Sequence, residues 1–554
     1  MGDLTVFRGA GKMGFLWGVI VLQECFDIVL RGARIVDGTG NPSFPGDVGI
    51  RDGRIALVGH VPQGDRDLDV SGMLLCPGFV DIHNHADHGI LAFPDAESHV
   101  MQGVTTSVVG NCGLSMAPIN PRRTELSRRY LAPFLRSEVE YGWDWKTSAE
   151  FFQKIKNNGT AMNLAPLVGH GTIRIAVMGF DDGVPSVEEM GLMKEMLAQS
   201  LEEGAFGLSS GLIYPPGSYA RAEELVELAG VMKDHGGFYA SHMRNEGDRL
   251  IESLEETLAL GERCGIPVQV SHLKAVGRAN WGKVNEALRL MESARQRGID
   301  VNCDVYPYQA GMTTLTALLP PAALEGGVER MLARLSDSAE RGRIEAQVEK
   351  GIPGWENWVK SLGWEKIVIS ECEARKDVEG RSLEEISCMW ECSPCQALFD
   401  LLLETRGIAT MLLFGIGEED LRAAVKNPMS CIASDSWVNA PRGGGKPHPR
   451  GYGTFPRFLK RFVRENGDLS WEEGIRKITA MPAAKAGIEE RGCVKEGFWA
   501  DLVVIDPEKI ADRATFQDPH RYPEGLSHVL VNGEFVVKEG RPTGHRPGKI
   551  LKRR

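Results

Sequence analysis

Two histidines with the spacing of metal ligands stand at the end of an apolar run early in the chain. The run GFVDIHNH contains His83 and His85. Residues two apart on a β-strand point to the same side, so both imidazoles can face one metal ion. Two surface histidines beside a turn would have the same spacing. The pair therefore needs further ligands before it indicates a metal site.

Four more residues of metal-binding type stand where other apolar runs end. Cys112 follows VTTSVVGN, His242 ends GFYASH, His272 ends VQVSH and Asp435 follows MSCIAS. Imidazole, thiolate and carboxylate together suit zinc, and a catalytic zinc needs three tight ligands and an open position. Only 13 histidines occur in the whole chain, so four at such ends are not scattered by chance. We predict these metal ligands: His83, His85, Cys112, His242, His272 and Asp435.

The elements that would position these ligands repeat a pattern of strand and helix. Residues 75–488 contain eight short apolar runs, and helical stretches such as SVEEMGLMKEMLAQSLEEG follow several of them. Eight such units predict an α/β fold, a closed (β/α)8 TIM-like barrel with its chemistry at the C-terminal ends of the strands. The longer gap before the eighth run predicts an insertion at roughly 310–370, on the catalytic face.

Both ends of the chain are rich in short strands with tight turns. Asp52-Gly53 and Asn532-Gly533 are turn dipeptides of β-hairpins, each between apolar segments. We predict that residues 26–74 and 489–545 together form a small β-sandwich domain and that the barrel lies between them in sequence. Residues 1–25 are predicted to be an atypical N-terminal extension, because the apolar run at 14–22 is short and lacks a cleavage site.

Composition excludes some classes of function. Of the 554 residues, 42% are hydrophobic and 25% charged, and the net charge of −12 argues against a nucleic-acid partner. No apolar stretch reaches the roughly 18 to 20 residues of a membrane span. The 11 cysteines follow no disulfide framework, which indicates reduced thiols and a cytoplasmic location. The sequence does not indicate an oligomeric state.

An ordered set of motifs resembles the D-aminoacylases of the amidohydrolase superfamily. The motifs are GFVDIHNHAD, VVGNCG, VGHGTIR, GLIYPPGSYA, SHMRNEGD, SHLK, ASDS and HPRGYGTFPR, and they span nearly the whole chain from Phe26. The resemblance implies a zinc-dependent hydrolase of N-acyl-D-amino acids. It also implies that Cys112, His242 and His272 hold a tight zinc. A weaker second site would then use His83, His85 and Asp435, with Cys112 shared.

The chain departs from many superfamily members on the fourth strand. The corresponding run AFGLSSGL has no lysine that could be carboxylated to bridge two metals. Cys112 would take the bridging place, as it does in D-aminoacylases.

Asp435 is the predicted catalytic residue. Zinc lowers the pKa of a bound water from about 16 toward 7, polarises the scissile carbonyl and stabilises the tetrahedral oxyanion. Asp435 would accept the proton of the water and pass it to the leaving amine. The alternative is a purely structural carboxylate at a strand end.

The carboxylate of such a substrate requires cations and hydroxyl groups. Lys274 shares a strand face with His272, and Arg450 in HPR can bind a carboxylate bidentately. By resemblance, Tyr214 and Tyr306 join Lys274 and Arg450 around the carboxylate. Tyr308 is the alternative to Tyr306, and each of these side chains could instead serve packing. The partner predicted is thus a small-molecule N-acyl amino acid.

Three other functions remain open from the sequence. A hydantoinase- or dihydroorotase-type cyclic amidohydrolase is disfavoured by the missing lysine and by Cys112. An N-acyl-L-amino-acid amidohydrolase would use the same motifs, because stereochemical preference depends on pocket geometry. A catalytically silent barrel scaffold is disfavoured because every expected ligand is present.

Overall fold

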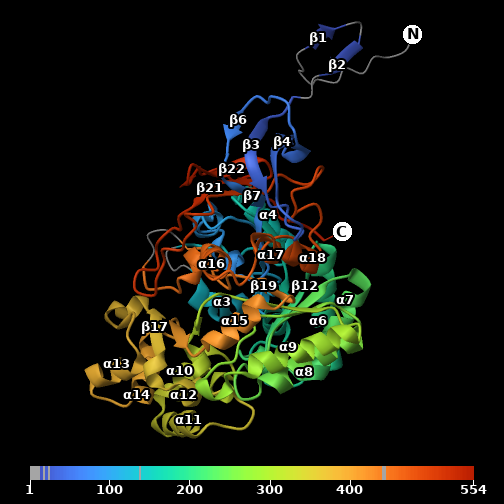
Figure 1. The fold of residues 1–554 in the computed structure, drawn as a ribbon. Helices are drawn as coiled ribbons and strands as arrows, with labels where there is room; N and C mark the ends of the chain where they lie inside the picture. The colour runs from blue at the N-terminus through green and yellow to red at the C-terminus, as the bar shows by residue number, and fades with distance from the viewer. Residues whose placement is uncertain (1–12, 17–18, 23–24, 136–138, 440–443, 554) are drawn as a thin grey trace.

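The computed structural model describes residues 13–16, 19–22, 25–135, 139–439 and 444–553. Three parts follow one another in space (Figure 1). A sheet made from both ends of the chain lies at one end of the molecule, the barrel strands and their helices lie in the middle, and a lobe from residues 310–414 lies beside the barrel.

The eight apolar runs of the central part form parallel strands that are buried along their whole length. The third run is split at Leu167 into two strands. The strands are β8 (Phe79–Asp81), β9 (Val104–Val109), β10 (Asn163–Pro166), β11 (Val168–Gly169), β12 (Gly207–Gly211), β13 (Phe238–His242), β14 (Val268–Val270), β15 (Val301–Val305) and β19 (Ser430–Ile432). Burial on both faces explains why they are continuous apolar runs rather than alternating ones.

The strand ladder differs from the closed barrel predicted. Hydrogen bonds join β10-β9-β8 in one sheet and β11-β12-β13-β14-β15-β19 in another. No ladder of the described residues joins β8 to β19. Segments beyond the strands connect there instead. The N–H of Asp435 donates to the carbonyl of His83, and the N–H of His85 donates to that of Ser436, both at 2.8 Å.

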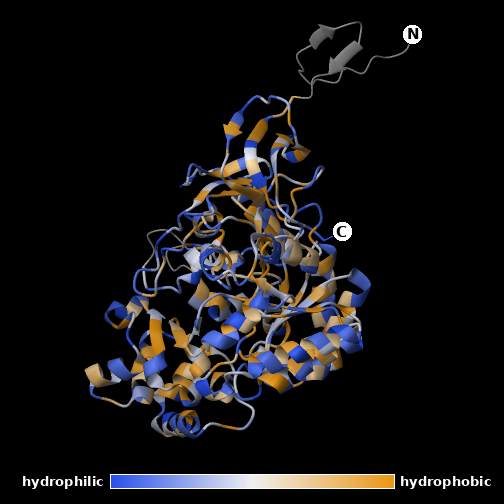
Figure 2. Ribbon diagram, viewed as in Figure 1, coloured by the Kyte–Doolittle hydropathy of each residue, from blue (hydrophilic) through white to orange (hydrophobic). Residues whose placement is uncertain are grey.

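Helices with one apolar side cover the outside of these strands (Figure 2). In α8 (Leu250–Cys264), for example, Leu250, Leu254 and Leu258 are buried at intervals of four residues. The helix ends at Gly265, which adopts a left-handed backbone conformation. The other helices around the strands are α4 (Ser148–Asn158), α5 (His170–Val177), α6 (Val187–Glu202), α7 (Ala222–His235), α9 (Lys283–Gln296), α15 (Glu418–Lys426), α16 (Arg450–Phe458), α17 (Trp471–Lys477) and α18 (Ala480–Ala486).

Strands from both chain ends form a single sheet rather than the β-sandwich predicted. The order is β23-β22-β21-β20-β7-β3-β4-β5, with β6 paired to β3. Because β7 pairs edge to edge with β20, the two sets of strands extend one sheet instead of facing each other. The strands are β3 (Ile28–Ile35), β4 (Phe44–Arg51), β5 (Arg54–Gly59), β6 (Asp67–Asp69), β7 (Leu74–Pro77), β20 (Leu502–Ile505), β21 (Leu526–Val531), β22 (Glu534–Lys538) and β23 (Arg541–Pro542).

The lobe beside the barrel has its own sheet and hydrophobic core. Strands β16 (Ala310–Thr314), β18 (Thr410–Phe414) and β17 (Ile367–Glu371) pair antiparallel in that order. Its helices are α10 (Val328–Ser336), α11 (Ser338–Lys350), α12 (Trp358–Leu362), α13 (Leu383–Trp390) and α14 (Pro394–Glu404). The range predicted for the insertion, roughly 310–370, holds β16 and most of β17. We propose that the inserted unit continues to the end of β18.

Within the predicted extension 1–25, the structure describes a short antiparallel pair. It consists of β1 (Met13–Leu16) and β2 (Val19–Leu22). In the described part of the chain, no helix combines the length and apolar character that crossing a membrane requires.

Candidate metal centre

The six residues predicted as metal ligands lie together in the middle of the molecule. Each is at or just beyond the C-terminal end of a barrel strand, and all six are buried. Donor atoms of four of them lie within 4.8 Å of one another. These four residues are His83, Cys112, His272 and Asp435.

Cys112 stands at the centre of the group. Its Sγ is 3.2 Å from His83 Nε2 and 3.6 Å from His272 Nε2. His272 Nε2 in turn lies 2.9 Å from His242 Nδ1. The thiol sulfur thus lies between histidines from three different strand ends, which suits an atom shared by two metal sites.

Asp435 joins the two histidines of the first run. Its Oδ1 is 3.4 Å from His83 Nε2 and 3.3 Å from His85 Nε2. The donor atoms that lie close together form two groups that share His272. One contains His83, Cys112, His272 and Asp435, and the other contains His242, Glu246 and His272.

Three of these residues have a backbone conformation that L-amino acids rarely adopt. The φ angles of Cys112, His272 and Asp435 are 53°, 36° and 49°. A non-glycine residue with positive φ is uncommon, and such strain gathers at functional sites. Each of these three residues lies in the turn that follows its strand, and its side chain reaches the cluster from there.

The charges favour metal binding. Burial alone would raise the pKa of the Cys112 thiol, but the imidazoles around it, His83 first, outweigh burial and hold this pKa well below its usual value. Burial also opposes ionisation of Asp435, yet Arg450 and the histidines hold the pKa of its carboxyl well below the usual range. A thiolate, a carboxylate and imidazoles are the donor set that zinc prefers, so the residues present fit a zinc centre.

The predicted substrate residue Lys274 lies beside the cluster and is already paired. Its Nζ donates to Glu246 Oε1 at 2.6 Å, and the same oxygen is 2.9 Å from His272 Nδ1. Burial raises the pKa of the Glu246 carboxyl, but Lys274 and the histidines outweigh it and bring this pKa to about 2. Glu246 therefore stays ionised and fixes both a cation and a candidate ligand.

Arg450 contacts the cluster. Its Nη1 is 2.8 Å from Asp435 Oδ2, and the side chain is 1% exposed. Among the described residues, none of its three guanidinium nitrogens has a hydrogen-bond acceptor in good geometry. The contact with Asp435 is thus an ion pair that leaves donors directed into the pocket for another anion.

The three tyrosines occupy different places. The ring of Tyr306 lies 5.8 Å from Lys274 Nζ and 4.8 Å from the guanidinium of Arg450. Tyr214 packs edge-on against His242 and accepts a hydrogen bond from Thr313 at 2.8 Å. Both line the cavity over the cluster. Tyr308 does not line this cavity but packs against His448.

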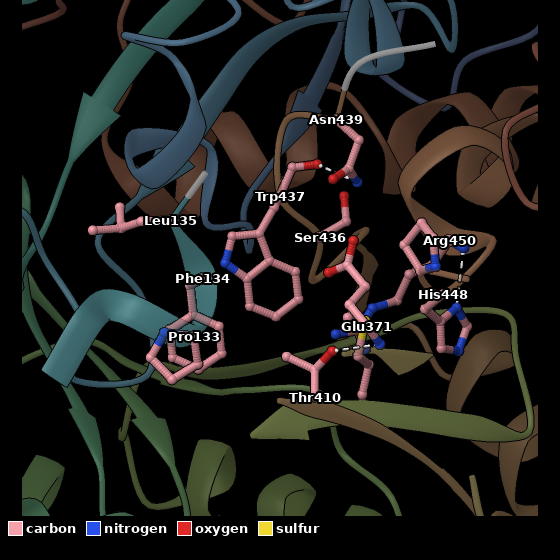
Figure 3. Close-up of a pocket in the computed structure, with 12 residues that line it drawn as sticks. Pro133, Phe134, Leu135, Glu371, Thr410, Ser436, Trp437, Asn439, His448 and Arg450 are labelled. Carbon is pink, nitrogen blue, oxygen red and sulfur yellow. Dashed lines mark hydrogen bonds between the residues drawn. The ribbon is translucent and has the colours of Figure 1, made fainter. Parts of the chain in front are cut away.

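Two cavities that share lining residues lie at and beside the cluster. The first, of about 470 Å³, is lined by five of the six candidate ligands and by an apolar wall, part of which comes from the inserted lobe. The second, of about 420 Å³, is more polar and includes Arg450 and His448. The indole of Trp437 lies between Phe134 and Arg450 and lines both cavities (Figure 3). The apolar wall of the first cavity comprises Leu114, Phe134, Met312, Trp358, Leu413 and Trp437.

Several residues of the site were not predicted in these positions. Neither Glu246 nor Asp304 was among the predicted site residues. Asp304 stands near the end of the seventh apolar run, a position that could have marked it. Met312 and Leu413 come from the inserted lobe, and no local pattern connects them to the ligands.

Comparison with known proteins identifies the family. The model of the family described as Amidohydrolase family matches residues 68–537. The chain belongs to the amidohydrolase family. A D-aminoacylase of Alcaligenes xylosoxydans xylosoxydans is 33% identical over 536 residues, which cover 96% of this chain and 98% of that protein.

Two solved structures match over nearly the whole chain. The N-acyl-D-glutamate deacylase of Bordetella bronchiseptica, complexed with zinc and a phosphonate inhibitor, is 32% identical with a TM-score of 0.80. The match covers 96% of this chain and all of that one. A D-aminoacylase with a binuclear metal center is 33% identical with a TM-score of 0.78, over 95% of this chain and all of that one.

These matches confirm the resemblance inferred from the sequence motifs. The chain is a metal-dependent amidohydrolase of the N-acyl-D-amino-acid deacylase group. They also confirm the α/β fold.

Proposed function

We propose that the enzyme hydrolyses the amide bond of N-acyl-D-amino acids, releasing a carboxylate and a free D-amino acid. One observation carries the proposal. A cluster of thiolate, imidazole and carboxylate donors within 4.8 Å of one another lies beside two buried cations, Lys274 and Arg450. The cluster supplies a place for amide hydrolysis, and the cations supply a place for the carboxylate of the amino acid.

The proposed metal ligands form two sites. Cys112, His242 and His272 would hold a tight zinc, and His83, His85 and Asp435 would form a weaker second site that shares Cys112. Zinc bound there would activate a water molecule as nucleophile and polarise the scissile carbonyl. The binuclear metal center of the D-aminoacylase relative supports two sites rather than one.

Asp435 is proposed to move the proton. Its Oδ1 lies against both His83 and His85, next to where the nucleophilic water would stand. The carboxylate accepts a proton from that water and passes it to the departing amide nitrogen as the C–N bond breaks. The pKa of Asp435 is held well below its usual value, so the carboxylate is ionised before the water gives up its proton.

Lys274, Arg450, Tyr306 and Tyr214 are proposed to bind the substrate. Both cations lie near the Tyr306 ring, with Lys274 Nζ 5.8 Å and the Arg450 guanidinium 4.8 Å from its centre, so a carboxylate beside this ring could contact both. Among the described residues, Nε and Nη2 of Arg450 have no acceptor, and Nη1 is paired with Asp435. The free donors support this role, since buried donors normally have partners. The preference for D-substrates rests on the relatives.

An assay of paired enantiomers tests the proposal. Zinc-analysed protein is incubated with N-acetyl-D-leucine, N-acetyl-L-leucine and the two N-acetylglutamates, and the free amino acid is detected. We expect release from D-substrates and a loss of at least about 1,000-fold in the Asp435→Asn variant. Release from L-substrates alone would overturn the stereochemistry. If no linear substrate is cleaved, the proposal fails and cyclic amides such as hydantoins are tested next.

A further inference from the structure

Asp304, on β15, is a buried carboxylate that contacts two of the proposed metal ligands. Its Oδ1 accepts a hydrogen bond from the backbone N–H of His272 at 2.8 Å and lies 3.0 Å from His83 Nδ1. Its Oδ2 accepts from Gln269 Nε2 at 2.9 Å. Asp304 does not line either cavity over the cluster, so it acts through other residues and not on the substrate.

The contact with His83 fixes which ring nitrogen faces the cluster. A carboxylate accepts hydrogen bonds, so the proton of the neutral imidazole is held at Nδ1. The lone pair of Nε2 then points toward Cys112 Sγ at 3.2 Å and Asp435 Oδ1 at 3.4 Å. His83 is thereby held in the tautomer and orientation that a metal ligand requires.

The contact with His272 holds a strained turn. His272 has a φ of 36°, and Asp304 binds this turn twice. Its side chain accepts from the N–H of His272, and its backbone carbonyl accepts from the N–H of Leu273, both at 2.8 Å. The turn brings His272 Nε2 to 2.9 Å from His242 Nδ1.

We propose that Asp304 is a positioning residue that sets the geometry of both metal sites at once. It orients His83 in the second site and secures the backbone that presents His272 to the tight site. The inference rests on the metal centre proposed above but not on the identity of the substrate. It predicts that zinc affinity depends on a residue that touches neither zinc nor substrate.

A purely structural role is the alternative. Burying a carboxylate is costly unless donors surround it, and Asp304 has three. A carboxylate whose only role was to hold the strands together would accept the same three hydrogen bonds. The two roles predict different zinc affinities for a variant that removes the charge of Asp304 but keeps the shape of its side chain.

Zinc affinity of the Asp304→Asn variant makes the distinction. The amide has the shape of the carboxylate, but its single oxygen can accept on one side only, and its NH2 group donates. Asn302→Ala is the matched control, since Asn302 lies two residues away on β15 and bonds only the carbonyl of Met429 in the contacts described. Wild type and both variants are stripped of metal, equilibrated against chelator-buffered zinc, and analysed for bound zinc and for the melting temperature of the stripped protein.

We expect Asp304→Asn to bind zinc about 10- to 100-fold more weakly, while Asn302→Ala binds like the wild type and the stripped proteins melt within a few degrees of one another. Asp304→Glu, which restores the charge, should recover part of the affinity. Wild-type affinity in Asp304→Asn, or an equal loss in Asn302→Ala, would overturn the positioning role. A wild-type protein that binds no zinc would instead overturn the metal centre, and the role of Asp304 with it.

Discussion

Arg450 and Asp435 form a buried ion pair beside the cluster, with Nη1 2.8 Å from Oδ2. The pair joins a residue proposed to bind substrate with the residue proposed to transfer the proton. A carboxylate entering the pocket would compete with Asp435 for the guanidinium. Substrate binding and the charge around the general base are therefore coupled.

Arg450→Lys should impair substrate binding although it keeps the charge. A lysine lacks the planar fork that can bind Asp435 and a substrate carboxylate together. We expect kcat/KM for N-acetyl-D-leucine to fall about 10- to 100-fold, mainly through KM. Steady-state kinetics measure the change. Arg457→Lys, at a neighbouring arginine that lines neither cavity, is the control.

Lys274 should favour substrates with a free α-carboxylate over the corresponding amides. We expect Lys274→Met to raise KM for N-acetyl-D-leucine at least about 10-fold, because a charge-assisted hydrogen bond is lost. N-acetyl-D-leucinamide, which lacks the carboxylate, should be cleaved slowly and nearly equally by both proteins. Zinc content is measured in parallel, since Lys274 also contacts His272. Equal losses on both substrates at full zinc content would contradict the role of Lys274 as a carboxylate clamp.

The apolar wall of the first cavity should favour apolar D-amino acids over acidic ones. Among the described residues that line this cavity, the one cation is Lys274, which the carboxylate next to the amide would occupy. Met312→Arg places a cation on this wall. We expect it to raise the ratio of kcat/KM for N-acetyl-D-glutamate over N-acetyl-D-leucine about 10-fold or more.

Met389→Arg is the control for this change. Met389 lies on α13 of the same lobe, is 46% exposed and lines neither cavity. An unchanged preference in Met312→Arg, or wild-type protein that favours glutamate, would show that another part of the site selects the side chain.

His99 should make the stability of the protein fall in mild acid. Burial of its ring lowers its pKa from 6.5 to about 4, so the unfolded chain binds a proton that the folded protein rejects. Above about pH 6.5 His99 is neutral in both states and does not lower the free energy of unfolding. As the pH falls from there toward 4, protonation of the unfolded chain lowers it progressively. Between pH 7 and pH 5 the free energy of unfolding should drop by about 2 kcal/mol from this residue.

Urea unfolding of metal-free wild type and His99→Gln at pH 7, 6 and 5 measures this effect. The glutamine does not titrate, so the variant should lose about 2 kcal/mol less than the wild type over this range. Metal-free protein avoids the separate pH dependence of zinc binding. Parallel pH profiles for the two proteins would contradict the prediction.

Much of the site could be predicted because strand ends leave a local signal. Cys112, His242, His272 and Asp435 each follow a buried strand, and parallel strands bring such positions together whatever their separation in sequence. The same logic found Lys274, which shares the strand face of His272. The family resemblance then separated the ligands into two groups.

Other parts depend on contacts that no local pattern contains. Glu246 binds Lys274 and His272 only because the loop after β13 packs against the segment that follows β14. Met312 and Leu413 enter the cavity because the inserted sheet docks on the barrel, and hydrophobic periodicity does not say where a sheet docks. The predicted sandwich failed for a similar reason, since strand periodicity is the same whether β7 and β20 pair at their edges or face each other.

The metal centre is tested most directly by adding zinc back to stripped protein. Chelator-treated wild type and Cys112→Ser are titrated with zinc while bound metal and hydrolysis of N-acetyl-D-leucine are followed. We expect the stripped wild type to be inactive and to recover with the first equivalent of zinc. Cys112→Ser should bind zinc at least about 100-fold more weakly and stay inactive at one equivalent. Full activity of the stripped wild type, or equal recovery of Cys112→Ser, would contradict the account.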